Sequence, residues 1–201
     1  DRATAKEIAK QVIEAFEGYA YVVVPSGSCA GMLSKHVPLL FDADEEPSWH
    51  ARATAFAASV VELTAFLADV LRVDFAGRAF PRRVAYHDSC SSFREMNVAA
   101  QPRKLLKSLD GLELAEMKDR EVCCGFGGTF SVKYPEISNE MVSQKAERLL
   151  ETKADVLTGA DLGCLMNIAG KLSREGRTVE VRHIAEILAG HLDEPGICSS
   201  E

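Results

Sequence analysis

The apolar positions of the chain follow a helical spacing in some segments and form short β-branched runs in others. The helical spacing predicts helices over residues 3–16, 31–40, 48–71, 103–108, 135–150, 165–174 and 183–189. The short runs predict strands over residues 19–24, 84–86, 112–114, 154–158 and 179–181. Strands that alternate with helices predict an α/β fold with a mainly parallel sheet.

Two stretches of the chain share one order of elements. In residues 13–32, and again in 149–166, a helix end is followed by a turn, a β-branched strand, a glycine-containing loop, a cysteine and a methionine. The match predicts two pseudo-repeated strand–loop–helix half-domains, and a common local shape without duplication is the alternative. We therefore expect a first half-domain over 1–80 that lacks its N-terminal part, a complete second half-domain over 81–192, and a flexible tail over 193–201.

The charge balance is acidic, with 30 Asp and Glu residues against 23 Lys and Arg residues and a net charge of −7. This balance argues against nucleic acid or an anionic membrane as the main partner. No apolar run approaches the roughly 20 residues that span a bilayer, so we expect no direct membrane span. The sequence also shows no signal-peptide pattern, and we expect a cytoplasmic protein whose six cysteines are reduced.

The adjacent cysteines Cys123 and Cys124 carry the strongest chemical signal. Neighbouring cysteines do not readily join in one disulfide, and Gly125 after them lets the backbone turn tightly. With Cys90 and Cys164 they make four thiolates from three loops, which suits a closed metal site. An iron–sulfur cluster is favoured because adjacent thiolates can bind separate irons, and zinc takes the same four ligands. Metal-free thiol redox chemistry and unrelated core cysteines are the further alternatives.

Three cysteines, Cys29, Cys90 and Cys164, each follow a predicted strand. In parallel sheets, functional sites collect beyond the carboxyl ends of the strands. The repeat pairs Cys29 with Cys164, and the loop that would correspond to Cys123 and Cys124 then falls N-terminal to the chain. We therefore expect Cys29 to belong to a second centre whose other ligands are absent here.

Other residues near these cysteines have two interpretations each. His87 and Asp88 precede the first cysteine of the set, where they either interact with the sulfurs of a cluster or cap the loop. Phe126 either shields a metal centre from water or packs in the core. Asp161 is expected to form a turn. Cys198 lies in the C-terminal tail, and we expect it to be outside the site.

The cysteine motifs resemble the cysteine-rich CCG domain family, whose pattern is a cysteine, a Cys-Cys-Gly and a Cys-x-x-Cys. This domain occurs in heterodisulfide reductase B, in the glycolate oxidase iron–sulfur subunit and in the lactate utilization protein A group. The resemblance is closest to the last group and covers nearly the whole chain. The stretches that carry it are residues 24–29, 86–90, 123–133 and 164–168.

The resemblance implies a metal centre held by cysteine thiolates. Its ligands would be Cys90, Cys123, Cys124 and Cys164. One departure from the family pattern is that Asn167 occupies the position of the last cysteine. Because heterodisulfide reductase B uses five cysteines for a non-cubane cluster, we expect a conventional 4Fe–4S cluster here. Asn167 would donate a hydrogen bond to a sulfur of the site, and His87, Asp88 and Gly125 would surround the site.

The resemblance also implies a function. We expect an iron–sulfur electron-transfer subunit of a complex that oxidises a 2-hydroxy acid, L-lactate to pyruvate or glycolate. The chain would be a subunit of an oxidoreductase rather than a stand-alone enzyme. Its partners would be other iron–sulfur subunits, flavin subunits, or both. A zinc-stapled structural or docking subunit without a redox role is the alternative, and a thiol–disulfide reductase is a third hypothesis.

Overall fold

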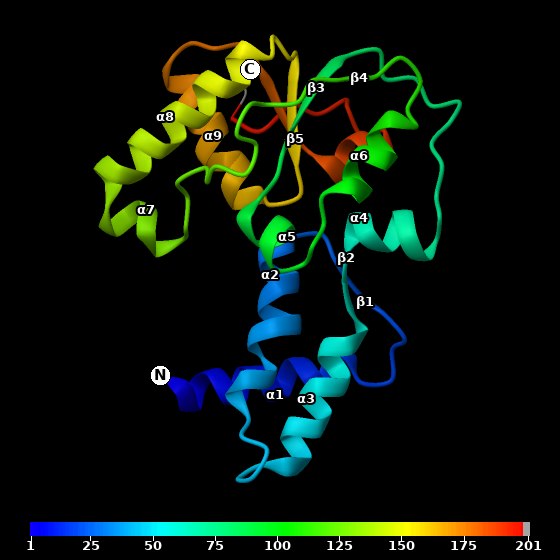
Figure 1. The fold of residues 1–201 in the computed structure, drawn as a ribbon, viewed down its shortest axis with the longest axis vertical. Coiled ribbons are helices and arrows are strands. Elements are labelled where there is room, and N and C mark those ends of the chain that lie inside the picture. Colours follow the sequence, from blue (N-terminus) through cyan, green and yellow to red (C-terminus); the bar gives the residue numbers. More distant parts are fainter. Residues whose placement is uncertain (199–201) are drawn as a thin grey trace.

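A four-stranded parallel sheet forms the centre of the larger part of the molecule in a computed structural model that describes residues 1–198 (Figure 1). The strands are β3 (Arg83–His87), β4 (Glu113–Leu114), β5 (Val156–Gly159) and β6 (Glu180–His183). Their order is β4-β3-β5-β6, and every neighbouring pair is parallel. The predicted α/β class with parallel strands is confirmed, and the pseudo-repeat stays a prediction.

One face of this sheet is covered by α8 (Pro135–Glu151) and α9 (Leu162–Arg174). Their apolar sides pack against Ala85, Leu157 and Val181, one residue from each of three adjacent strands. The buried positions of both helices recur at three- and four-residue spacing, as expected for one apolar side of a helix.

The opposite face is covered by α6 (Ala100–Lys107) and α10 (Ile184–Ala189), which pack on Tyr86 and Val156. Burial on both faces is typical of a parallel sheet. Because successive side chains of a strand point to opposite faces, His87 lies on the side of the sheet that α8 and α9 cover. This places the last side chain of β3 beside the cysteine loops.

The smaller N-terminal part contains α1 (Arg2–Phe16), α2 (Gly27–Gly31), a π-helix (Met32–His36), a 3-10 helix (Pro38–Leu40) and α3 (Pro47–Ser59). Figure 1 shows these elements beneath the larger part, with α2 leading up toward α5. They enclose a core of their own, formed by Ala9, Ile13, Val22, Ala30, Val37, Phe41, Ala53, Phe56 and Val60.

The prediction of one long helix over residues 48–71 is wrong. The chain leaves the helical conformation at β2 (Val60–Glu62), which pairs in parallel with β1 (Val22–Val24). Helical structure resumes in α4 (Leu63–Ala65) and a π-helix (Phe66–Val70). The β-branched pair at the start of β2 favours an extended backbone, and the carboxylate that ends β2 accepts hydrogen bonds from two N–H groups of α4. A strand partner therefore overrides the helical spacing.

Two short helices complete the fold, α5 (Cys90–Arg94) and α7 (Thr129–Lys133). In the C-terminal segment, the N–H of Ile197 donates to the carbonyl of Val181 at 2.8 Å. The last three residues of the predicted tail, 199–201, lie outside the described residues. Within residues 1–198, none of the helices combines the length and apolar character that crossing a membrane requires.

Candidate metal centre

Five cysteines line one cavity of about 560 Å³: Cys29 from the N-terminal part, and the four cysteines of the predicted site from three loops of the larger part. Cys90 is the first residue of α5, directly beyond β3, and Cys164 lies in the first turn of α9, beyond β5. Cys123 and Cys124 lie in the loop between β4 and α7. Because the strands are parallel, their carboxyl ends meet at one edge of the sheet, and this arrangement brings the loops together. Within residues 1–198 all the cysteines are free thiols.

The Cys-Cys-Gly loop is fixed by hydrogen bonds from two helices. Gly125 has a φ of 81°, and a Cβ there would lie 2.6 Å from the carbonyl oxygen of Ser138, so only glycine fits. The Ser138 hydroxyl donates to the Gly125 carbonyl at 2.8 Å. Asn167 donates to the Cys124 carbonyl at 2.9 Å, and the Gly125 N–H donates to the Cys123 sulfur at 3.4 Å. Asn167 thus holds the loop through a backbone carbonyl, whereas the sequence led us to expect a sulfur as its acceptor.

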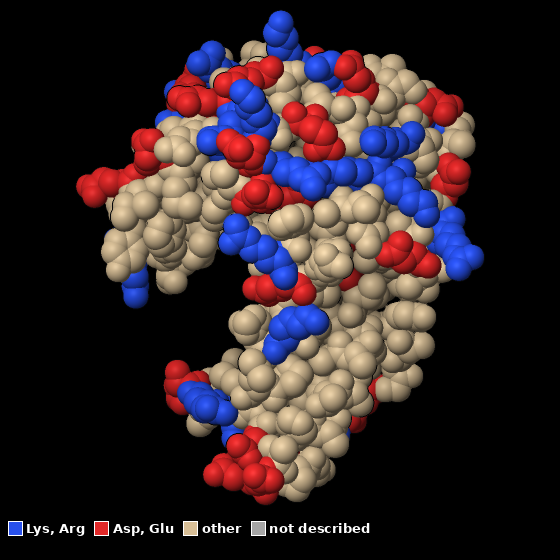
Figure 2. Space-filling view, viewed as in Figure 1, with Lys and Arg blue, Asp and Glu red and all other residues tan. Residues whose placement is uncertain are grey.

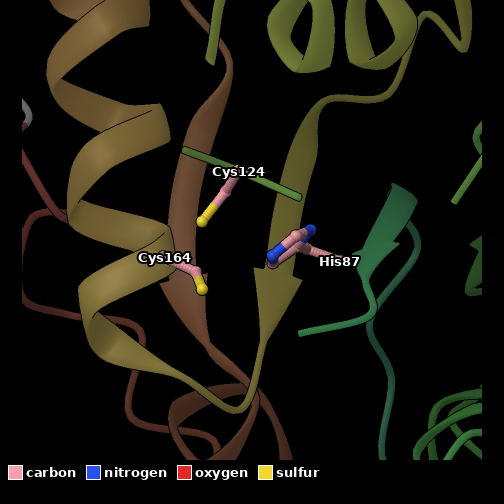
Figure 3. Close-up of side chains that lie close together, drawn as sticks. All are labelled: His87, Cys124 and Cys164. Atoms are coloured by element: carbon pink, nitrogen blue, oxygen red, sulfur yellow. The ribbon is translucent and has the colours of Figure 1, made fainter. Parts of the chain in front are cut away.

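His87 lies at the buried end of the cysteine set. Figure 3 shows its ring beside the sulfurs of Cys124 and Cys164, with one ring nitrogen facing them. A ring nitrogen and the two sulfurs all lie within 4.8 Å of one another. The residue is 1% exposed, and among the described residues neither ring nitrogen has a hydrogen-bond partner. The nitrogen and sulfur donors and their spacing fit a metal centre.

The buried Asp88 side chain forms an ion pair with Arg103. The Arg103 guanidinium donates to both oxygens of the buried Asp88 carboxylate, at 2.8 and 2.7 Å. It also donates to Glu116 at 2.7 and 2.9 Å, and this hydrogen bonding lowers the pKa of Glu116. The pairing of Asp88 with Arg103 on α6 is a contact that neither of the two sequence interpretations named.

The four thiols share protons. Hydrogen bonding from Cys124 and Cys90 lowers the pKa of Cys123 well below its usual range. Hydrogen bonding with Cys123 is also the largest cause that raises the pKa of Cys90 and of Cys124. Hydrogen bonding from Cys124 lowers the pKa of Cys164. A metal centre that binds all four sulfurs displaces the protons that these thiols hold.

The cysteine-rich CCG domain family matches residues 84–169, which contain all four cysteines and His87. Lactate utilization protein A of Oceanobacillus iheyensis is 51% identical over 187 residues, which are 93% of this chain and 75% of that protein. The protein of the same name from Geobacillus sp. (strain WCH70) is 50% identical over 184 residues, 92% of this chain and 76% of that protein. The chain belongs to the lactate utilization protein A family. The resemblance seen in the sequence motifs is confirmed.

Asp161 connects the two parts of the molecule at this family's cysteine loops. Its carboxylate is 4% exposed and accepts hydrogen bonds from the hydroxyls of Ser26 at 2.7 Å and Ser28 at 2.6 Å. The second oxygen accepts from Ser89 and, at 3.4 Å, from Ser92. The expected turn former is therefore a buried acceptor for hydroxyls from both parts. Its sequence signal, an aspartate after a buried strand, did not reveal this role.

Lys145 is a second residue that the sequence analysis missed. Its side chain is fully buried, and its ammonium donates to the carbonyl of Arg120 at 2.7 Å, just before the cysteine pair. Burial lowers the pKa of Lys145. A signal for this role exists, because Lys145 lies on the same apolar side of α8 as Val142, Ala146 and Leu149. A lysine at such a position needs a buried acceptor.

The wall of the cavity also includes residues from the N-terminal part. Cys29 lies on it together with Pro25, although the sequence analysis assigns Cys29 to a separate centre. Phe126 lines the same cavity, whereas Cys198 lines a different one. Among the described residues on this wall, Asp161 is the one with a charged side chain. Figure 2 shows a hollow between the two parts of the molecule, with both uncharged surface and charged side chains on its inner wall.

Proposed function

We propose that this chain is the iron–sulfur electron-transfer subunit of a cytoplasmic complex that oxidises a 2-hydroxy acid. L-lactate, oxidised to pyruvate, is the proposed substrate of the complex, and glycolate is the alternative. The substrate is suggested by the name of the relatives, lactate utilization protein A. The proposed partners are other iron–sulfur subunits, flavin subunits, or both, which would supply the catalytic site and accept the electrons.

The observation that carries the proposal is the convergence of four cysteines on one partly buried cavity. The proposed ligands of a 4Fe–4S cluster are Cys90, Cys123, Cys124 and Cys164. When bound, such a cluster supplies one-electron transfer. The chain itself holds the thiolates in place through the Asp161, Asn167 and Lys145 hydrogen bonds, and Phe126 limits the access of water.

Anaerobic purification and reconstitution with ferrous iron and sulfide test this proposal. We expect about four irons and four sulfides per chain, a brown protein, and an electron paramagnetic resonance (EPR) signal after one-electron reduction. Serine variants of each of the four cysteines should lose most of the bound iron. Cys198→Ser is the matched control because Cys198 lies outside the cavity, and it should keep its iron. A colourless protein with stoichiometric zinc and no iron would falsify the cluster proposal.

A zinc-stapled docking subunit is the second candidate, and one observation favours it. His87 offers a nitrogen donor beside the sulfurs of Cys124 and Cys164, and zinc accepts mixed nitrogen and sulfur ligands. Metal analysis of the purified protein separates the two candidates. Zinc that persists through reconstitution with iron and sulfide, without any redox signal, supports the docking subunit.

We also propose that the chain consists of two related half-domains, 1–80 and 81–192, followed by the tail 193–201. The separate core of residues 9–60 supports a division into two parts. Ala68, however, packs in the core of the larger part. Limited proteolysis tests the division: the first cuts should fall between residues 71 and 82 and leave two protected fragments.

Cys29 is proposed to serve a second centre, and its place on the shared cavity wall makes this proposal testable. If Cys29 belongs to a separate centre, Cys29→Ser leaves the iron content and the EPR spectrum of the four-cysteine centre unchanged. A loss of iron that matches the loss in Cys90→Ser would assign Cys29 to the same centre instead.

A further inference from the structure

His87 is placed to do more than pack beside the cysteines. It is 1% exposed, and among the described residues neither of its ring nitrogens has a hydrogen-bond partner. Buried polar atoms in folded proteins are nearly always paired, so a ring with two unpaired nitrogens needs an explanation. One nitrogen faces the sulfurs of Cys124 and Cys164 (Figure 3). The ring therefore points into the site that the thiols form.

The fold holds the ring in this position. His87 is the last residue of β3, and its register partner on β5 is Gly159. A Cβ at Gly159 would lie 3.1 Å from the His87 carbonyl oxygen and 3.5 Å from the His87 Cβ, so the glycine leaves the space that His87 occupies. Because the side chain belongs to a central strand of the sheet, no loop has to become ordered when the ring binds a ligand.

A hydrogen bond to sulfur alone does not satisfy this ring. A neutral imidazole has one N–H donor and one nitrogen lone pair. Once a metal has displaced the thiol protons, the neighbouring sulfurs can accept a hydrogen bond but have no proton to donate. The lone pair of the nitrogen that faces Cys124 and Cys164 can instead bind a metal held by those two sulfurs, since the three atoms lie within 4.8 Å of one another. Neutral imidazole nitrogen is also the commonest metal ligand in proteins.

We propose that His87 binds the metal centre directly, through the ring nitrogen that faces Cys124 and Cys164. This inference rests on the metal centre of the proposed function. His87 is then a fifth protein ligand beside the four thiolates, and because imidazole is neutral it adds no negative charge to the centre.

Pulsed EPR on protein labelled with ¹⁵N-histidine tests this role. The full chain is reconstituted anaerobically with ferrous iron and sulfide and reduced by one electron. We expect a hyperfine coupling of the size given by a directly bound imidazole nitrogen. His87→Gln should lose this coupling and, by analogy with weakened metal sites, bind the metal at least about tenfold less tightly. If the protein retains zinc instead, Co²⁺ replaces zinc as the paramagnetic probe.

The matched control is His36→Gln, because the His36 side chain is 52% exposed and lies outside the cavity. This variant should keep the nitrogen coupling and the metal content of the wild type. A wild-type spectrum with only the weak coupling of a hydrogen-bonded nitrogen overturns the inference and leaves the metal centre intact. A protein that binds neither iron nor Co²⁺ overturns the proposed function as well. The wild-type spectrum decides even if His87→Gln does not fold.

Discussion

Replacing Asp161 should weaken the junction between the two parts of the molecule. Its carboxylate accepts from Ser26 at 2.7 Å and from the Ser28 hydroxyl and N–H at 2.6 and 3.1 Å, in addition to Ser89 and Ser92. Burial raises its pKa, but the hydrogen bonds from Ser28, Ser89 and Ser26 outweigh burial and lower the pKa. The carboxylate is therefore ionised in the folded state at neutral pH.

The size of the stability loss depends on which hydrogen-bond partners of Asp161 can bind water once the carboxylate is removed. Hydrogen bonds to a charged group contribute about 1.5–3 kcal/mol each, and a buried partner left unpaired adds a cost. Ser26 and Ser28 are only partly buried or exposed and can bind water, whereas Ser89 and Ser92 are buried. Asp161→Ala should therefore lower the free energy of unfolding by about 3 kcal/mol. Asp161→Asn should cost about 1 kcal/mol, because an amide can accept on one side and donate to a serine hydroxyl on the other.

Urea denaturation of the metal-free, reduced protein at pH 7 measures both values. A loss of 3 kcal/mol moves the midpoint by about 1 M urea. Because the folded pKa is lowered, the stabilisation is fully present above the unfolded pKa, about 3.9, and is lost as the pH falls through the folded pKa. Asp44→Ala, at an exposed carboxylate, is the control. The reasoning fails if the free energy of unfolding of Asp161→Ala lies within about 0.5 kcal/mol of that of the control, or if Asp161→Asn loses as much stability as Asp161→Ala.

Four further substitutions test other contacts. Gly27→Ala should destabilise the protein by about 2 kcal/mol, since its Cβ would lie 2.7 Å from the Ser92 nitrogen and 2.8 Å from the Ser92 Cα. Gly170→Ala is the matched control: its Cβ would make only an ordinary contact, and the change should stabilise the helix by about 0.5–1 kcal/mol. Thermal melts measure both changes. Burial raises the pKa of Glu62. The wild type therefore loses stability as the pH rises from the pKa of the unfolded state, about 4.3, through the raised pKa of the folded state. Glu62→Gln should be more stable than the wild type at pH 7 and equally stable near pH 4, and parallel curves of stability against pH would refute this prediction. Asn167→Leu removes the hydrogen bond to the Cys-Cys-Gly loop. The change should lower the free energy of unfolding by about 1 kcal/mol and speed the release of metal to a chelator. An unchanged release rate would contradict the role of that bond.

The sequence predicts the elements whose signals are local. The strands β3 and β5 and the helix α8 all lie within a few residues of their predicted bounds, because short β-branched runs and a proline at the first turn mark them. The break in the predicted helix 48–71 depends on pairing between β2 and β1, and no local pattern contains that information.

The site also has features that the local sequence reveals and features that depend on long-range contacts. The Cys-Cys-Gly run and the strand-end position of Cys90 are visible along the chain, and they identify the loops that the structure brings together. The role of Asp161 depends on Ser26, which is 135 residues away in sequence. The place of Cys29 on the cavity wall depends in the same way on the packing of α2 against α5. Long-range contacts of this kind need the three-dimensional fold.

The spread of the cysteines along the chain has a consequence for how the protein is made. The loops that hold Cys90 and Cys164 follow β3 and β5, two adjacent strands that pair only after α8 has crossed between them. Parallel pairing of distant segments forms late in folding, and during synthesis the N-terminal residues emerge first. The thiols of Cys90, Cys123 and Cys124 therefore leave the ribosome before their last partner exists. At the proposed metal centre, insertion would then follow the closing of the sheet, and a filled centre would mark a chain that has finished folding.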